Sequence, residues 1–240
     1  MRYPNFDNDS ARFGGGFDSS LAQERSNTFM QRVYWWMVVG LGLTGAISFF
    51  VGSNVALATA LLPFYWPLVI VQLVVVLALS FLSQRVSGPM SAFLFLLYSA
   101  LNGVTLSVIF LAFKLGSIAL AFGVTAGAFL ALSLFATFTK RDLSGMATFL
   151  IIGLFGIVIA GIVNLFVQSD ALAFVKSCAA VLVFGGLTAY DTQKLRRYHA
   201  QTGFSSAMSL AVNGALTLYL DFINLFLNLL WLLGGERRRS

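Results

Sequence analysis

The stretch Leu216–Leu230, LTLYLDFINLFLNLL, decides the fold because it has the apolarity of a membrane-spanning helix and yet carries a carboxylate, Asp221, near its middle. Apolar segments of about 20 residues are long enough to cross the hydrocarbon core of a bilayer. A charged aspartate at the centre of such a helix costs about 2.5–3.5 kcal/mol on insertion scales. Asp221 is therefore interpreted as a functional residue, unless a partner or protonation removes its charge.

Further polar residues lie on the same face of this predicted helix. The spacings from Asn213 through Thr217, Asp221 and Asn224 to Asn228 are 4, 4, 3 and 4 residues, which is the repeat of one helical face. Polar groups that faced lipid would lack hydrogen-bond partners. We therefore expect other helices to surround this helix, with the polar stripe facing a polar interior. Asn213 and Thr217 are interpreted as hydrogen-bonding contacts between helices.

The composition outside this stretch also indicates an all-α polytopic membrane protein. The chain has 240 residues, of which 58% are hydrophobic and only 10% are charged, whereas a soluble domain carries roughly a quarter charged residues. The formal net charge is +6, but the basic residues lie at the ends of the apolar segments and not along one helical face. Nucleic-acid binding is therefore not expected. The single cysteine, Cys178, falls inside an apolar segment, so no disulfide framework is expected.

Seven segments are long enough, or nearly so, to span a membrane, and they divide the chain into three regions. We predict a flexible cytoplasmic tail over 1–32, which contains no signal peptide, a membrane domain over 33–233 and a short basic tail over 234–240. The short connections leave no room for a soluble module. The predicted spans are 33–52, 65–83, 91–113, 117–138, 146–167, 171–190 and 206–233.

The distribution of lysine and arginine predicts the orientation. The N-terminal tail and the second, fourth and sixth connections hold most of the basic residues, so these parts are predicted to be cytoplasmic. Seven full crossings would place Glu236–Ser240, with its three arginines, on the other side. Either the C-terminus departs from the positive-inside rule or one late segment does not cross completely.

A second aspartate, Asp191, ends the sixth span in the sequence TAYD. Taken alone it would cap the helix or pair with Lys194. If the sixth and seventh spans pack together across their short connection, however, Asp191 would approach Asp221. Two carboxylates close together in a poorly solvated place do not both ionise readily and would share a proton, as in a pH sensor. When ionised, the pair would also provide hard oxygen ligands for Ca²⁺. Arg85, at the end of the second span, would serve as counter-ion, or is simply a positive-inside arginine.

Four motifs make the chain from about Arg32 onward resemble the Bax inhibitor-1 family, and in particular its bacterial inner-membrane members. The motifs are AYDTQKL (Ala189–Leu195), the Leu216–Leu230 stretch, TKRDLSG (Thr139–Gly145) and YSALNGVTLS (Tyr98–Ser107). The resemblance implies a multi-pass protein of the bacterial inner membrane. It also implies a seven-helix fold in which the last helix is central and wrapped by the other six.

The resemblance further implies a pH-dependent leak for Ca²⁺ gated by two aspartates between the last two helices. By motif these aspartates fall on Asp191 and Asp221, and an arginine of the second helix falls on Arg85 through its spacing to NGVTL. At low pH the shared proton and Arg85 would hold the path closed, and deprotonation would open it. No cofactor is expected. The expected partners are the lipid bilayer, Ca²⁺ or another cation, and other membrane proteins.

Two other functions fit parts of the sequence. An intramembrane aspartyl protease would also use two aspartates on adjacent helices, and Tyr190-Asp191 fits its first motif, but Asp221 is not preceded by Gly-x-Gly. A non-transporting protein that binds and modulates another membrane protein would use the polar core only to specify its fold. Other signatures of an enzyme are missing from the sequence, and the sole histidine, His199, lies in a basic connection. We therefore expect no enzymatic activity.

Overall fold

The computed structural model describes residues 7–82, 87–198 and 207–234, and these are almost entirely helical. Seven segments of this described part are long and apolar enough to cross a membrane, by length and composition. The predicted all-α architecture with seven spans is therefore confirmed. In chain order the elements are α1 (Asp7–Ser53), α2 (Val55–Leu61), η1 (Leu62–Phe64), α3 (Tyr65–Leu82), α4 (Gly88–Leu106), α5 (Ile109–Ala112), α6 (Leu115–Phe138), η2 (Leu143–Met146), α7 (Ala147–Val167), α8 (Asp170–Tyr198) and α9 (Ala207–Leu233).

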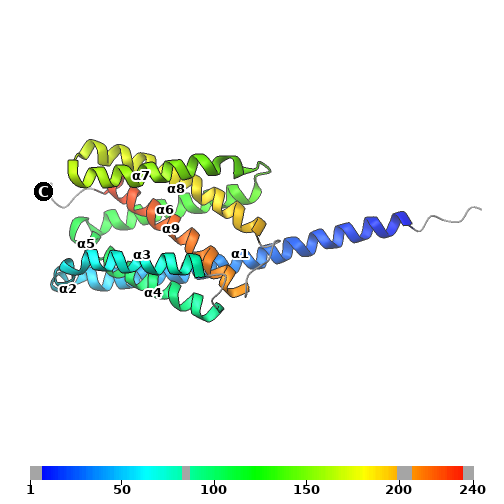
Figure 1. Cartoon of the computed structure of the whole chain (residues 1–240), viewed down its shortest axis with the longest axis horizontal. Coiled ribbons are helices and arrows are strands. Elements are labelled where there is room, and N and C mark those ends of the chain that lie inside the picture. The colour runs from blue at the N-terminus through cyan, green and yellow to red at the C-terminus, as the bar shows by residue number, and fades with distance from the viewer. Residues whose placement is uncertain (1–6, 83–86, 199–206, 235–240) are drawn as a thin grey trace, which may run out of the picture.

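The last helix, α9, lies in the middle of the bundle, as predicted. It packs closely against α1, α4, α6 and α8, while α3 packs mainly on α4 and α7 mainly on α8. Figure 1 shows α9 crossing obliquely between a group formed by α6, α7 and α8 and a group formed by α1, α3 and α4. Four helices therefore form the inner contact shell of α9, and α3 and α7 complete the wrapping from outside.

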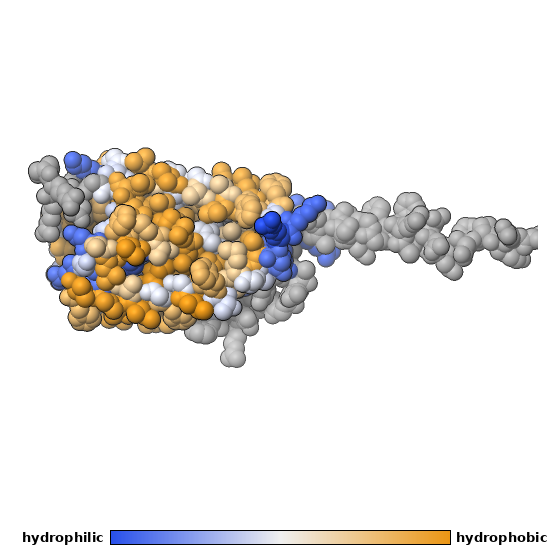
Figure 2. Space-filling view, turned by 90° about the horizontal axis from the view of Figure 1, so that it is seen from above, coloured by the Kyte–Doolittle hydropathy of each residue, from blue (hydrophilic) through white to orange (hydrophobic). Residues whose placement is uncertain are grey.

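Burial explains why α9 is the central helix and α7 a peripheral one. In α9, Ala211, Val212, Ala215, Leu218 and Tyr219 are all completely buried. In α7 the only buried residue is Leu150, although this helix is strongly apolar. An apolar helix with an exposed surface is suited to lipid contact. Figure 2 shows that hydrophobic residues dominate the side of the bundle, with hydrophilic residues gathered towards its two ends.

The first helix starts earlier than the predicted span. It runs as one helix from Asp7 to Ser53 and projects beyond the bundle at one end (Figure 1), so residues 7–32 are helical where the sequence predicted a flexible tail. Phe29 and Met30 are only 3% and 4% exposed and belong to the same hydrophobic core as Val33 and Met37. These four residues share one helical face, which continues across the polar residues that marked the predicted boundary.

The second span is also longer and less regular than predicted. It comprises α2, η1 and α3, and the part that is apolar enough to cross the membrane runs from Val55 to Ser80. Pro63 lies within η1 and Pro67 in the first turn of α3. Proline lacks a backbone donor and disfavours helix at the residue before it, which explains the break between α2 and α3.

The direction of α9 bears on the number of crossings. Figure 1 shows that α9 ends at the end of the bundle opposite to the one from which α1 projects. The last segment, α9, therefore runs the full length of the bundle. The basic residues of 236–240 lie outside the described residues.

Candidate functional site

The centre of the candidate site is a pair of carboxyl groups between α8 and α9. The side chains of Asp191 and Asp221 lie next to each other, within reach of a hydrogen bond. A hydrogen bond between two carboxyl groups requires a proton on one of them, because an ionised carboxylate only accepts. Asp221 is 5% exposed, and its Oδ2 is buried without a hydrogen-bond partner among the described residues. The two aspartates of the sequence hypothesis are thus neighbours, and Asp221 is deeply buried.

Residues next to Asp191 on α8 fix the helix around this pair. Thr188 and Thr192 are completely buried, and the Thr192 hydroxyl lies 3.4 Å from the Ser133 hydroxyl of α6. Lys194 acts on Asp191 electrostatically, but its ammonium lies over the ring of Tyr190, 5.7 Å from the ring centroid. Asp191 thus has both Asp221 and the positive charge of Lys194 as neighbours.

A cavity of about 540 Å³ opens beside the carboxyl pair, between α7, α8 and α9. Along α8 its lining runs from Lys176 to Asp191, a separation of 15 residues and so about 22 Å, or most of a 30 Å hydrocarbon core. Both aspartates contribute to the wall. The lining residues are Leu154, Ile157, Val158, Gly161, Lys176, Phe184, Leu187, Asp191, Thr217, Leu220, Asp221, Asn224 and Asn228.

Most of the polar stripe of α9 faces this cavity. The cavity is lined by Thr217, Asn224 and Asn228. Asn213 lies one helical turn before Thr217 and is not among the lining residues. Thr217 donates a hydrogen bond to the carbonyl of Asn213, Asn224 to that of Leu220 and Asn228 to that of Asn224. The sequence predicted that Thr217 would form a hydrogen bond between helices, but the bond found for it lies within α9. Because each Asn amide donates to its own helix, its Oδ1 is left as an acceptor for other groups.

Lys176 is a residue that the sequence hypothesis did not assign to the site. It is half-buried in α8 and lines the end of the cavity away from the carboxyl pair. The sequence spacing could have indicated this residue. Lys176 and Asp191 are 15 residues apart, which is close to four helical turns and places them on nearly the same face of α8. The cavity therefore has a positive group at one end and two carboxyl groups at the other.

The connection between α6 and α7 is fastened to the end of α8 just after the carboxyl pair. Gln193 accepts a hydrogen bond from the backbone N–H of Leu143 at 2.9 Å and donates one to the carbonyl of Arg141 at 2.9 Å. Arg197 donates to Asp142 Oδ1 at 2.7 Å. Hydrogen bonds from Ser144 and then from Arg197 lower the pKa of Asp142 to about 2. The residues of TKRDLSG and YDTQ that gave the sequence resemblance thus contact one another.

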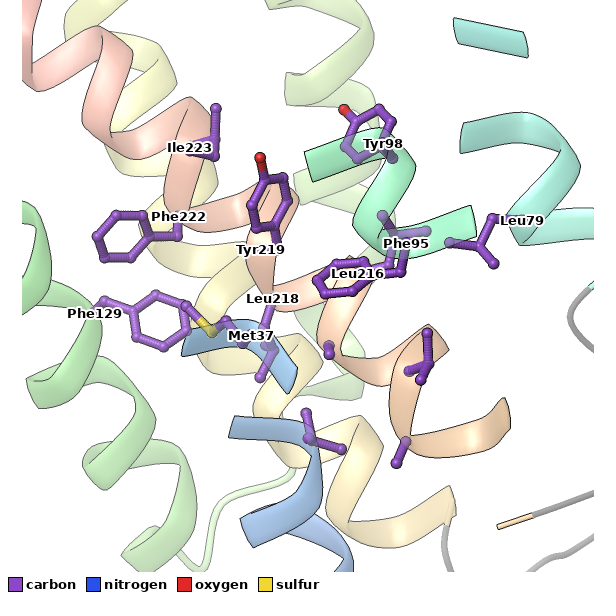
Figure 3. Packing of buried hydrophobic residues seen from close by; sticks show 14 of the residues in the cluster. Met37, Leu79, Phe95, Tyr98, Phe129, Leu216, Leu218, Tyr219, Phe222 and Ile223 are labelled. Carbon is purple, nitrogen blue, oxygen red and sulfur yellow. The ribbon is translucent and has the colours of Figure 1, made fainter. Parts of the chain in front are cut away.

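The opposite face of α9 carries a buried polar cluster around Tyr219, which sequence reasoning missed. The Tyr219 hydroxyl accepts a hydrogen bond from Asn102 Nδ2 at 2.8 Å and lies 2.7 Å from the Thr44 hydroxyl, which donates to the Ser99 carbonyl. Figure 3 shows the Tyr219 ring beside Phe95 and Tyr98 of α4, and Phe222 pointing towards Phe129 of α6. Tyr219 therefore links α9 to α1 and α4.

The remaining predicted residues are not placed. Arg85 and His199 lie outside the described residues, so the predicted latch between Arg85 and the carboxyl pair stays a prediction. Among the residues that the structure describes, no three His, Cys, Asp or Glu side chains come together as a metal site. Ca²⁺ takes six to eight oxygen ligands in proteins, so two carboxyl groups are better suited to a transient contact than to tight binding.

Comparison with known proteins places this geometry in context. Residues 26–238 match the family model described as "Inhibitor of apoptosis-promoting Bax1". The chain is 45% identical over 226 residues to inner membrane protein YbhL of Escherichia coli K12, which covers 91% of this chain and 97% of that protein. It is 43% identical over 209 residues to an uncharacterised protein of Deinococcus radiodurans, covering 86% and 90%. It is also 39% identical over 227 residues to an uncharacterised protein of Borreliella burgdorferi, covering 90% and 98%.

Proposed function

Because the chain belongs to the Bax inhibitor-1 family, we propose that this multi-pass inner-membrane protein is a leak for Ca²⁺ or another cation, opened by deprotonation of Asp191 and Asp221. The observation that carries the proposal is the pair of neighbouring carboxyl groups at the end of a cavity between α7, α8 and α9, whose wall includes Thr217, Asn224 and Asn228. Titratable groups inside a membrane domain are costly and generally mark an ion or proton pathway.

The closed state is the one in which the two carboxyl groups share a proton. The hydrogen bond between Asp191 and Asp221 then holds α8 against α9. As the pH rises and this proton leaves, the bond is lost and two negative charges face each other at short range. Repulsion separates the helices at this point and extends the cavity past the carboxyl pair. Arg85 remains the proposed counter-ion of the closed state.

The rest of the cavity supplies groups for a cation in transit. Thr217, Asn224 and Asn228 present hydroxyl and amide oxygens along about 16 Å of α9, from the 11 residues that separate the first from the last. Several weak oxygen sites in a row favour passage over retention. No cofactor and no enzymatic activity are part of the proposal.

The orientation belongs to the same proposal. The end of α8 that carries Asp191 also carries Lys194, Arg196 and Arg197, and it lies at the same end of the bundle as the start of the packed part of α1. Basic residues mark the cytoplasmic side, so the carboxyl pair would lie nearer the cytoplasm and Lys176 nearer the outside.

The test is Ca²⁺ flux into liposomes that contain the purified protein, from pH 5 to pH 8, for the wild type, Asp191→Asn, Asp221→Asn and Asp170→Asn. Asp170 is the matched control, because it is an exposed aspartate on α8 that does not line the cavity. We expect flux that rises with pH in the wild type and in Asp170→Asn, and flux that is independent of pH in the other two variants.

Absence of flux at every pH from folded wild-type protein would overturn the leak. The reading as a non-transporting protein that modulates another membrane protein would then be preferred. An intramembrane protease would show cleavage of a membrane-spanning substrate that is abolished by either Asp→Asn variant, and no such activity is expected.

A further inference from the structure

A second cavity, on another side of α9, is independent of the proposed leak. It is a groove of about 900 Å³ between α1 and α6. These two helices each pack against α9 and not substantially against each other, and Phe222 of α9 contributes to the lining between them. The lining residues are Asn27, Met30, Gln31, Tyr34, Met37, Val38, Leu41, Gly42, Gly45, Ala46, Phe122, Ala126, Phe129, Leu130, Ser133, Leu134, Thr137, Arg196 and Phe222.

The chemistry of the groove changes along its length. Asn27, Gln31, Thr137 and Arg196 make one end polar, and Arg196 is the only charged residue among the described residues that line it. From Tyr34 to Ala46 the α1 wall is apolar. The 12 steps from Tyr34 to Ala46 extend about 18 Å, close to the roughly 15 Å thickness of the hydrocarbon in one leaflet. The groove therefore has the dimensions and polarity of one lipid, with a head at one end and a chain along it.

Arg196 has donors available at the polar end. Its recorded side-chain contact is a long hydrogen bond of 3.4 Å from Nη2 to Asn27 Oδ1. Among the described residues, Asp142 forms its ion pair with the neighbouring Arg197 and not with Arg196. A guanidinium presents several N–H groups in a fork that matches a phosphate, and basic pockets between helices at this depth suit phospholipid head groups.

The apolar part of the groove is left open by small residues. Gly42 and Gly45 are exposed, and a Cβ built on either glycine would meet no other atom within 4 Å. Ala46 and Ala126 continue this narrow wall on the two sides of the groove. Larger side chains at these positions would fill the space without disturbing the core.

We propose that the groove between α1 and α6 binds one anionic phospholipid, with its phosphate at Arg196 and an acyl chain lying along Gly42 and Gly45. The single positive charge at the end of an apolar channel complements a lipid that carries one net negative charge, on its phosphate. A second copy of this chain would use the apolar wall but would leave the guanidinium without a defined partner.

Native mass spectrometry of the purified full-length chain tests the proposal, with phosphatidylglycerol and phosphatidylcholine of the same acyl chains as probes. Arg196→Gln removes the charge, and Arg197→Gln is its control at the same end of the bundle. Gly42→Leu and Ala46→Leu each fill the groove. Gly123→Leu is their control, because Gly123 has equal space around it on α6 but lies outside the lining.

We expect one retained phosphatidylglycerol in the wild type and in both controls, and a preference for it over phosphatidylcholine. Arg196→Gln should weaken phosphatidylglycerol binding by roughly tenfold, as for loss of hydrogen bonds to a charged group, and should abolish the preference. Gly42→Leu and Ala46→Leu should weaken binding of both lipids.

Three results would overturn the proposal. Equal retention in the wild type and all three groove variants would place any bound lipid elsewhere. Equal affinity for the two lipids in the wild type would show that the net negative charge of the lipid is not recognised, and would overturn the choice of an anionic phospholipid. A dimer that dissociates in Gly42→Leu and Ala46→Leu would make the groove an interface between copies. Since binding is measured without ion flux, failure of the proposed leak would leave this test unchanged.

Discussion

The carboxyl pair makes a quantitative prediction about the pH dependence of cation flux. In the proposed closed arrangement Asp191 and Asp221 would share one proton, and opening would release it. The free-energy difference between two states that differ by one bound proton changes by about 1.4 kcal/mol per pH unit. The open population therefore rises by at most about tenfold per pH unit, and levels off once the pair is fully deprotonated.

Asp221→Asn removes this slope while keeping the geometry. The amide of Asn can donate a hydrogen bond to the Asp191 carboxylate, so α8 and α9 stay joined without a proton that titrates. Stopped-flow measurement of Ca²⁺ entry into liposomes at intervals of half a pH unit should give a low, flat profile for this variant. Asp170→Asn should retain the slope of the wild type.

Two results would refute this reasoning. A logarithmic slope clearly above one per pH unit would mean that more than one proton controls opening, so the shared proton is not the whole switch. A slope that persists in Asp221→Asn would assign the pH dependence to other groups. Circular dichroism and gel filtration of each variant would establish that the comparison is between folded proteins.

Three further predictions follow from other contacts. Gly103→Ala should lower the free energy of unfolding in detergent by about 1–3 kcal/mol, because the added Cβ would lie 2.8 Å from the Thr44 carbonyl oxygen. Gly42→Ala is the control: its added Cβ would meet open space, so this variant should be as stable as the wild type or slightly more stable. Equal melting temperatures would contradict this. Lys176→Gln should raise cation flux several-fold at fixed pH without changing the slope, because it removes a positive charge from the cavity; lower flux would contradict the assigned path. The pKa of Asp142, about 2, implies that its bond to Arg197 persists until the pH falls well below 3.8. NMR titration of the Asp142 carboxyl group should find this low pKa in the wild type and a higher pKa in Arg197→Gln.

Much of the architecture could be predicted because it depends on patterns local to the sequence. The seven spans follow from apolar length, and the central place of α9 follows from a polar stripe that lipid cannot satisfy. The contact between Asp191 and Asp221 was predictable because α8 and α9 are adjacent in sequence with a short connection. The limits of α1 were missed because Phe29 and Met30 belong to the core although their neighbours are polar.

Features that depend on distant packing could not be predicted. Tyr219 meets Thr44 and Asn102, which are 175 and 117 residues away, so no local pattern joins them. The groove between α1 and α6 arises because both helices rest on α9 without closing against each other. Neither helix shows this in its own sequence. Gln193 likewise lies in a recognisable motif, but its hydrogen bonds to the connection between α6 and α7 required the fold.

The two faces of α9 differ in the polar groups that they present to neighbouring helices, and this difference indicates which helix would move in the proposed opening. On one face Tyr219 is buried and hydrogen-bonded to α1 and α4 by groups that do not change charge near neutral pH. On the other face Asp221 holds α8 through a bond that a single proton can make or break. Gln193 and Arg197 bind the end of α8 to the connection that precedes α7, and α7 packs mainly on α8, so these two helices are joined. Loss of the shared proton should therefore leave α9 in place with α1 and α4, and displace α8 together with α7, on the side where the cavity already lies.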